Sequence, residues 1–225
     1  MTDQKVTRLE RIKKYGLPKY TLGEEIFNSI THGFGAAASI VGLVFLVLKA
    51  HDAVATASAV IFAAVSIALY TVSCVYHGMG VGAAKKYLRV ADHCTIFLMI
   101  GGCYTPFVFM ALQGTAQIVV LLGVWATGIL GIALNMVDLK RFSKLSMACY
   151  IIMGWFVVGA FPMLMRSMEK KALILMLAGG LAYTVGAVIY GIGKKCKLPY
   201  AHTVYHFFVL AGTGLHYAMV YLYFL

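Results

Sequence analysis

Long apolar stretches run through this chain and decide what it can fold into. Seven of them are close to the ~20 residues that an α-helix needs to cross the hydrocarbon of a bilayer. We place them at residues 25–49, 53–78, 91–112, 116–136, 145–165, 172–193 and 201–224. A transmembrane barrel would instead need alternating segments of about 10 residues, which are absent from the sequence. The sequence therefore predicts an all-α membrane protein, a bundle of seven transmembrane helices.

The predicted spans use almost the whole chain. With 61% hydrophobic and only 12% charged residues, the sequence excludes a water-soluble domain of ordinary surface chemistry. We expect a basic cytoplasmic tail at residues 1–20 and one transmembrane domain at residues 21–225. The tail carries Val6, Leu9 and Ile12 among its charges, so it is either a short amphipathic helix on the membrane surface or a solvated segment.

The positive charges are distributed unevenly between the two ends of the predicted bundle. Six lysines and arginines lie in the tail, and three lie in each of the connections that contain Lys85, Lys140 and Lys194. The connections on the other side carry four. Because positively charged segments resist translocation, we expect a cytoplasmic amino terminus and an external carboxyl terminus. The net charge of +11 then reflects contact with anionic lipid headgroups, and no nucleic-acid partner is inferred.

Ionisable residues inside the spans are the informative ones, because such groups are costly in lipid without a partner. His202 and His206 are four residues apart and share one helix face, and the predicted topology puts His77 at the same depth. Three imidazoles without a thiolate suit a zinc ion that keeps its fourth position open. The alternative is that the histidine pair only bonds to neighbouring helices.

Two further polar residues complete a candidate catalytic centre. Asp92 is at the same depth and is the candidate proton acceptor for a water molecule, and Ser73 lies one turn before His77, where its hydroxyl could hold that water or the carboxylate. Structural alternatives stand beside these roles. Asp92 could stabilise the start of its helix, and Ser73 could bond back to its own helix.

The remaining polar positions have supporting roles in this prediction. Glu25, Asn28 and His32 form one stripe of the first span, and we expect them to support the site or pack helices rather than bind the metal. His216 lies about 15 Å beyond His206 along the helix, too far to share the ion, and either lines an outer cavity or bonds to a neighbouring helix. Small residues around Gly186 predict a close-packed helix face.

Together these motifs resemble the hemolysin III family, the bacterial branch of the progestin and adipoQ receptor superfamily. The matching patterns are E-x-x-N-x-x-x-H at Glu25, Asn28 and His32, S-x-x-x-H at Ser73 and His77, the acidic position Asp92 before His93, and H-x-x-x-H at His202 and His206. The resemblance spans essentially all seven helices. It implies an N-inside bundle in a bacterial inner (plasma) membrane that holds zinc through His77, His202 and His206, with Asp92 and Ser73 beside the bound water.

The resemblance also frames the expected activity. Animal relatives are associated with ceramidase-like hydrolysis of lipid amides, and bacterial relatives with membrane lipid homeostasis or, by their name, cytolysis. We therefore predict a zinc-dependent hydrolase acting on a lipid amide or ester at the cytoplasmic leaflet. The alternatives are a non-enzymatic, zinc-stabilised sensor of lipid packing and a cytolytic protein. The expected partners are the bilayer and a lipid substrate, and the sequence does not identify protein partners.

Overall fold

All regular structure in the described part of the chain is helical. The computed structural model describes residues 7–225, so Lys5 and Val6 of the predicted tail lie outside the described residues. In chain order the elements are α1 (Arg8–Tyr15), α2 (Leu22–Lys49), α3 (Ala53–Gly78), α4 (Ala83–Ala111), α5 (Gly114–Asp138), α6 (Ser143–Trp155), the 3-10 helix η1 (Phe156–Ala160), α7 (Phe161–Ser167), α8 (Lys170–Cys196) and α9 (Ala201–Tyr223).

Six helical segments within residues 7–225 are long and apolar enough to cross a membrane. They are α2, α3, α4, α5, the continuous run Ser143–Ser167, and α8. The chain is therefore an integral membrane protein with an all-helical fold, as predicted. The seventh expected span, α9, is 23 residues long but does not belong to this set. Its three histidines and four tyrosines lower its mean hydropathy.

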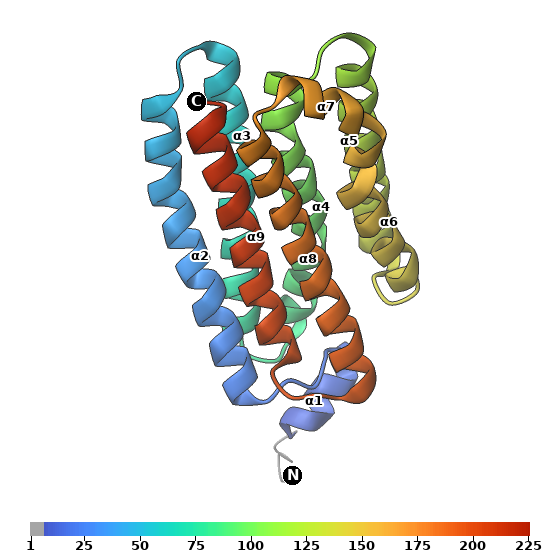
Figure 1. Ribbon diagram of the computed structural model, residues 1–225. Helices are drawn as coiled ribbons and strands as arrows, with labels where there is room; N and C mark the ends of the chain where they lie inside the picture. The colour runs from blue at the N-terminus through green and yellow to red at the C-terminus, as the bar shows by residue number, and fades with distance from the viewer. Residues whose placement is uncertain (1–6) are drawn as a thin grey trace, which may run out of the picture.

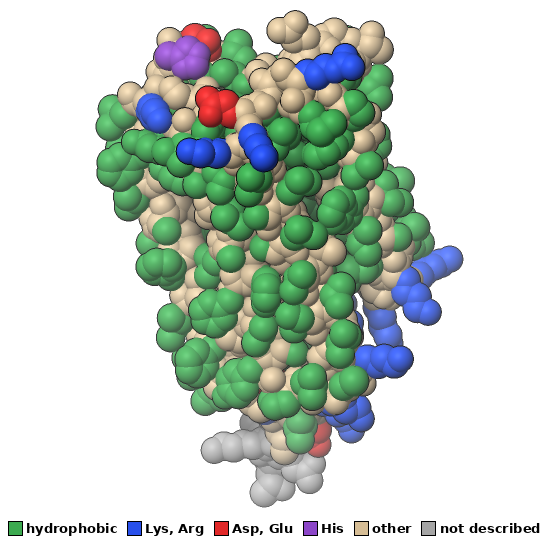
Figure 2. Space-filling view, viewed as in Figure 1, with side chains coloured by type: hydrophobic (Ala, Val, Ile, Leu, Met, Phe, Trp, Pro, Cys, Tyr) green, Lys and Arg blue, Asp and Glu red, His purple; other side chains and the backbone are tan. Residues whose placement is uncertain are grey.

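The long helices form an upright bundle in which α4 is the most buried span (Figure 1). Helix α2 packs against both α3 and α9, α8 packs against α9, and the α5–α6 pair joins the bundle mainly through α4 and lies to one side. Hydrophobic side chains cover the middle of the visible face, and charged ones gather near its upper end and along its lower right edge (Figure 2). A Cβ atom built on Gly186 of α8 would lie 2.6 Å from the Cβ of Phe208 in α9, which confirms the predicted close packing there.

The predicted helix bounds hold for α3 but are wrong for α4. Helix α4 begins at Ala83, eight residues before the apolar run at residue 91. The stretch AAKKYLR is polar yet rich in good helix formers, so it extends the helix without adding apolarity. Asp92 consequently lies well inside α4, and the interpretation that it stabilises the start of its helix is wrong.

The predicted span at residues 145–165 is a broken helix. A 3-10 segment, η1, separates α6 from α7, and Pro162 stands in the first turn of α7. Proline lacks an N–H and its ring clashes with the carbonyl four residues earlier, so the regular helix cannot continue through it. The hydroxyl of Tyr104 in α4 accepts a hydrogen bond from the Val157 N–H at 2.9 Å and donates to the Gly154 carbonyl at 3.0 Å. One side chain thus satisfies backbone groups on both sides of the break.

The described part of the tail is folded against one end of the bundle. Helix α1 has a capping box at Thr7 and Glu10, and it ends at Gly16, whose φ of 63° suits glycine. Ile12 of α1 is buried, and Arg89 of α4 donates a hydrogen bond to the Gly16 carbonyl at 2.9 Å. The amphipathic helix expected as one alternative for the tail is therefore present.

Candidate metal centre

Three histidine side chains converge at the end of the bundle next to α1. The Nε2 atom of His202 lies 3.2 Å from Nε2 of His77 and 3.1 Å from Nε2 of His206. These residues offer ligand atoms that all lie within 4.8 Å of one another. His77 comes from the last turn of α3, and the other two come from the first turns of α9. The structure thus brings together the three residues predicted as ligands.

The donor set fits a metal ion. With Zn–N distances of about 2.0–2.1 Å, tetrahedral geometry puts neighbouring ligand nitrogens about 3.3 Å apart. The observed spacings of 3.1 and 3.2 Å are close to that value. Three imidazole nitrogens without a thiolate leave one tetrahedral position for another ligand, the arrangement typical of catalytic rather than structural zinc.

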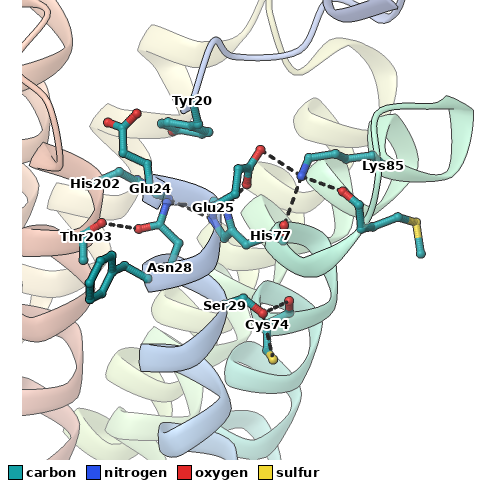
Figure 3. Close-up of polar contacts among 12 residues, drawn as sticks. Tyr20, Glu24, Glu25, Asn28, Ser29, Cys74, His77, Lys85, His202 and Thr203 are labelled. Carbon is teal, nitrogen blue, oxygen red and sulfur yellow. Dashed lines mark hydrogen bonds and ion pairs between the residues drawn. The ribbon is translucent and has the colours of Figure 1, made fainter. Parts of the chain in front are cut away.

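The other ring nitrogen of His77 is held by α2. Its Nδ1 lies 2.7 Å from Oε2 of Glu25, and the amide nitrogen of Asn28 lies 3.5 Å away. Because a carboxylate only accepts hydrogen bonds, the Nδ1 atom carries the proton and donates it to Glu25. Such a bond fixes the ring orientation and leaves Nε2 free to bind a cation. The other oxygen of Glu25, Oε1, pairs with Lys85 of α4 at 2.9 Å (Figure 3).

His206 is held from α2 in a similar way. The Thr31 hydroxyl lies 3.2 Å from Nδ1 of His206, and its own proton goes to a backbone carbonyl of its helix, at Phe27 or Asn28. The ring of His32 stacks on that of His206 at 3.5 Å with an interplanar angle of 8°. Both ring nitrogens of His32 are buried without a hydrogen-bond partner in residues 7–225. His32 therefore supports a ligand by stacking.

The predicted stripe on α2 does reach the site. Glu25 and His32 each contact one candidate ligand ring. The side-chain oxygen Oδ1 of Asn28 accepts a hydrogen bond from the Thr203 hydroxyl at 2.6 Å (Figure 3). Glu24, the N3 residue of the capping box of α2, accepts a hydrogen bond from the Tyr200 N–H at 2.9 Å. Tyr200 has a left-handed backbone with φ of 56°, so this bond helps fix a strained residue just before His202.

Asp92 and Ser73 are buried beside the histidines but outside the ligand cluster. The Asp92 carboxyl group lies next to the Ser73 hydroxyl and in the electrostatic field of His77. The buried Ser73 oxygen has no hydrogen-bond partner among the described residues. The interpretation that it bonds back to its own helix is therefore wrong.

His202 is enclosed by aromatic rings. Tyr20 stacks on it at 5.2 Å with an interplanar angle of 21°, and the ring of Tyr190 lies 5.1 Å away. Tyr20 precedes α2 and belongs to the segment that folds back from α1. Burial, with a smaller effect of Tyr190, raises the pKa of Tyr20 above its ordinary value, so the side chain remains a neutral phenol. The tail therefore closes this end of the site.

His216 lies away from the centre, as predicted. Its Nε2 lies 3.1 Å from the Met176 carbonyl of α8, and the ring borders a cavity of about 40 Å³. Both alternatives offered for His216 are thus present. A larger cavity of about 280 Å³ borders the site itself and is lined by His77, Glu25 and Lys85 together with exposed apolar residues of α2 such as Ile26 and Ile30.

Sequence reasoning missed several residues that support the ligands. They are Tyr20, Thr31, Lys85 and Thr203. Two signals point to them in retrospect: Thr31 and Thr203 are adjacent to His32 and His202, and Lys85 stands in a helix-forming run just before Asp92. Tyr20 has no such signal, because its role depends on the return of the chain from α1.

This chain is similar to known proteins over most of its length. The model of a family described as "Haemolysin-III related" matches residues 20–217. The chain is 34% identical to "Hemolysin-3" of Bacillus cereus over 223 residues, which cover 98% of this chain and 96% of that protein. It is 37% identical to "Hemolysin-3 homolog" of Bacillus subtilis (strain 168), covering 87% and 92%. It is 26% identical to the human "Monocyte to macrophage differentiation factor", covering 96% and 93%.

Proposed function

Because the chain belongs to the hemolysin III family of the progestin and adipoQ receptor superfamily, we propose that it is a zinc-dependent membrane hydrolase of lipids. It would cleave an amide bond, as a ceramidase does, or an ester bond. The observation that carries this proposal is the convergence of three Nε2 atoms at the end of α3 and the start of α9, with Asp92 and Ser73 buried beside them.

The proposal includes a placement in the membrane. We propose that α9 is a seventh span, since it runs alongside α2 and α8 over most of their length (Figure 1). We also propose a cytoplasmic amino terminus, because the end of the bundle with α1 holds most of the lysines and arginines. The metal centre then lies at the cytoplasmic leaflet of the bacterial plasma membrane, a location that the bacterial relatives support.

The chemistry follows from the positions of the side chains. A zinc ion at this centre would polarise a carbonyl group and make a water molecule more acidic. Glu25 and Thr31 orient two of the candidate ligand rings through Nδ1, so that their Nε2 atoms would be available to bind the ion. Asp92 accepts the proton of the attacking water, and the Ser73 hydroxyl holds the carboxylate or that water. The apolar membrane-spanning helices around the centre suit the acyl chains of a lipid.

Turnover by purified protein tests this function. Wild type is loaded with zinc, reconstituted, and given long-chain ceramides and glycerolipids. We expect hydrolysis of one lipid class, and Asp92→Ala should keep its zinc while turnover falls by about 10²- to 10⁴-fold. Glu169→Ala removes an exposed carboxylate at the other end of the bundle and should leave turnover unchanged. Zinc-loaded protein that hydrolyses no lipid, or an Asp92→Ala variant with full turnover, would refute the proposal.

A non-enzymatic sensor of lipid packing is the second candidate. It is favoured by the way the ligands join α3 to α9 across 125 positions of sequence, because a metal there would hold the bundle together. Deletion of the gene should then change membrane fluidity. If Asp92→Ala restores normal fluidity to the deletion strain, the sensor function is favoured over hydrolysis. If wild type restores normal fluidity and Asp92→Ala does not, hydrolysis is favoured.

Cytolysis is the third candidate and has support from the names of the bacterial relatives. The spans are apolar along their length, whereas a water-filled pore needs a polar lining. Release of a trapped dye from vesicles by pure protein would favour cytolysis.

A further inference from the structure

Lys85 is a buried cation in an unusual place. It lies in the first turn of α4 and is only 3% exposed. A positive charge is unfavourable at a helix amino terminus, and a buried charge is costly unless it is paired. Lys86, the next residue of the same helix, is exposed, so its charge is in contact with water, unlike that of Lys85. The burial of Lys85 therefore needs a compensating set of contacts.

Those contacts match the ammonium group completely. Lysine has three N–H donors, and the Lys85 Nζ donates to Oε1 of Glu25 at 2.9 Å, to the Met79 carbonyl at 2.9 Å and to the His77 carbonyl at 3.2 Å. The two carbonyls belong to the carboxyl-terminal end of α3, where backbone oxygens lack helical partners and a cation is favourable. Lys85 of α4 thus caps the helix turn that carries His77.

The same lysine also acts on the side chain of His77 through Glu25. One oxygen of Glu25 pairs with Lys85, and the other accepts the hydrogen bond from Nδ1 of His77 at 2.7 Å (Figure 3). Glu25 is only 6% exposed, so without Lys85 it would be a buried carboxylate with no cation beside it. Lys85 therefore holds His77 at two points, the backbone carbonyl directly and the imidazole through the carboxylate.

We propose that Lys85 is a positioning residue for the metal centre, which aims Nε2 of His77 at the ion by capping α3 and fixing Glu25. This inference rests on the proposed metal site, but it does not depend on hydrolysis. The contacts connect three helices, α2, α3 and α4, at the single ligand that does not come from α9. They predict that the site loses affinity for metal when Lys85 loses its charge, although Lys85 itself binds no metal.

Metal affinity of the purified full-length protein tests the proposal. Zinc binding is measured by competition with a chromophoric chelator, and Co²⁺-loaded protein is examined by visible absorption for its ligand geometry. Lys85→Met keeps the length of the side chain without its charge and should bind zinc about 10- to 100-fold more weakly, with a changed Co²⁺ spectrum, as expected for loss of an outer partner of a ligand. Lys86→Met is the matched control and should bind within about twofold of wild type.

A second variant covers the case in which Lys85→Met does not fold. The double variant Lys85→Met/Glu25→Gln removes both charges, so it leaves no unpaired buried carboxylate, and it should fold with the same weakened binding. Wild-type affinity and an unchanged Co²⁺ spectrum in either folded variant would overturn the role of Lys85. Wild type that binds zinc but hydrolyses no lipid would refute only the hydrolase, and wild type that binds no metal would overturn both proposals.

Discussion

At the scale of single residues, the three candidate ligands are held to different degrees. Glu25 holds Nδ1 of His77 and Thr31 contacts Nδ1 of His206, and both partners come from α2. The Nδ1 atom of His202 has no hydrogen-bond partner in the described chain. His202 is fixed instead by the rings of Tyr20 and Tyr190. Ring packing, rather than a hydrogen bond to Nδ1, therefore sets the orientation of this candidate ligand.

Removal of one ligand should empty the site. In His206→Ala the remaining two imidazoles cannot complete a three-ligand set, so we expect the zinc content of purified protein to fall from about one ion per chain to below about a tenth of that. Elemental analysis after gel filtration measures it. His216→Ala is the control, since this histidine contacts the Met176 carbonyl away from the centre. Loss of metal from His216→Ala, or full zinc content in His206→Ala, would contradict the assignment.

The candidate ligands and the supporting stripe on α2 could be placed from the sequence, whereas Lys85 could not. Helical spacing puts His202 and His206 on one face, and counting spans brings His77 to the same depth. Lys85 was counted as one of the cations that set the topology, because nothing in a sequence shows which lysine of a connection turns inward. Its contacts form only when the first turn of α4 folds against the end of α3.

At the scale of helices, the break within Ser143–Ser167 depends on one side chain of a neighbouring element. Backbone groups freed by a broken helix have no water to bond with inside a bilayer. The Tyr104 hydroxyl supplies both a donor and an acceptor for them. Helix α4 therefore supports α6 and η1 by hydrogen bonding as well as by packing.

Tyr104→Phe should destabilise this region while keeping the ring in place. The Val157 N–H and the Gly154 carbonyl both lose their partner, so we expect the free energy of unfolding to fall by about 1–3 kcal/mol. Unfolding in mixed detergent measures the change. Tyr87→Phe removes a hydroxyl from a side chain that is 71% exposed and should change stability little. Equal stability of the Tyr104→Phe and Tyr87→Phe proteins would show that the two bonds do not support the break.

Apolar runs predict where helices lie, but they do not predict where a helix starts in polar sequence or where its regular backbone is interrupted. The bounds of α3 agree with the apolar run, because Asp52 caps the start of that helix and the run itself ends at Gly78. The start of α4 and the break before α7 were missed, since one extends a helix through polar residues and the other interrupts a helix within apolar ones. Pro162 was the available signal for the break.

At the scale of the whole molecule, the proposed orientation in the membrane follows from the end of the bundle that holds most of the lysines and arginines. Cys196, at the end of α8 that carries Lys194 and Lys195, is the exposed cysteine of the described chain. His51 lies in the connection between α2 and α3, at the opposite end. These two positions therefore report on opposite faces of the membrane.

A charged maleimide that does not cross membranes should distinguish the two faces. On intact cells we expect labelling of His51→Cys/Cys196→Ser but not of wild type, and wild type should react only after the membrane is opened, because Cys196 faces the cytoplasm in the proposed orientation. The mass shift of the labelled protein on a gel measures labelling in both conditions, intact cells and opened membranes. Labelling of wild type on intact cells would show that Cys196 faces the outside and that the proposed orientation is wrong.

The histidine cluster joins residues 77 and 202, and its last two members stand on the final helix of the chain. During synthesis the first six helical spans are made before His202 and His206. In the proposed function, loading with metal would thus be a late event in biogenesis, and a chain cut short before α9 would reach the bilayer without two of the three candidate ligands.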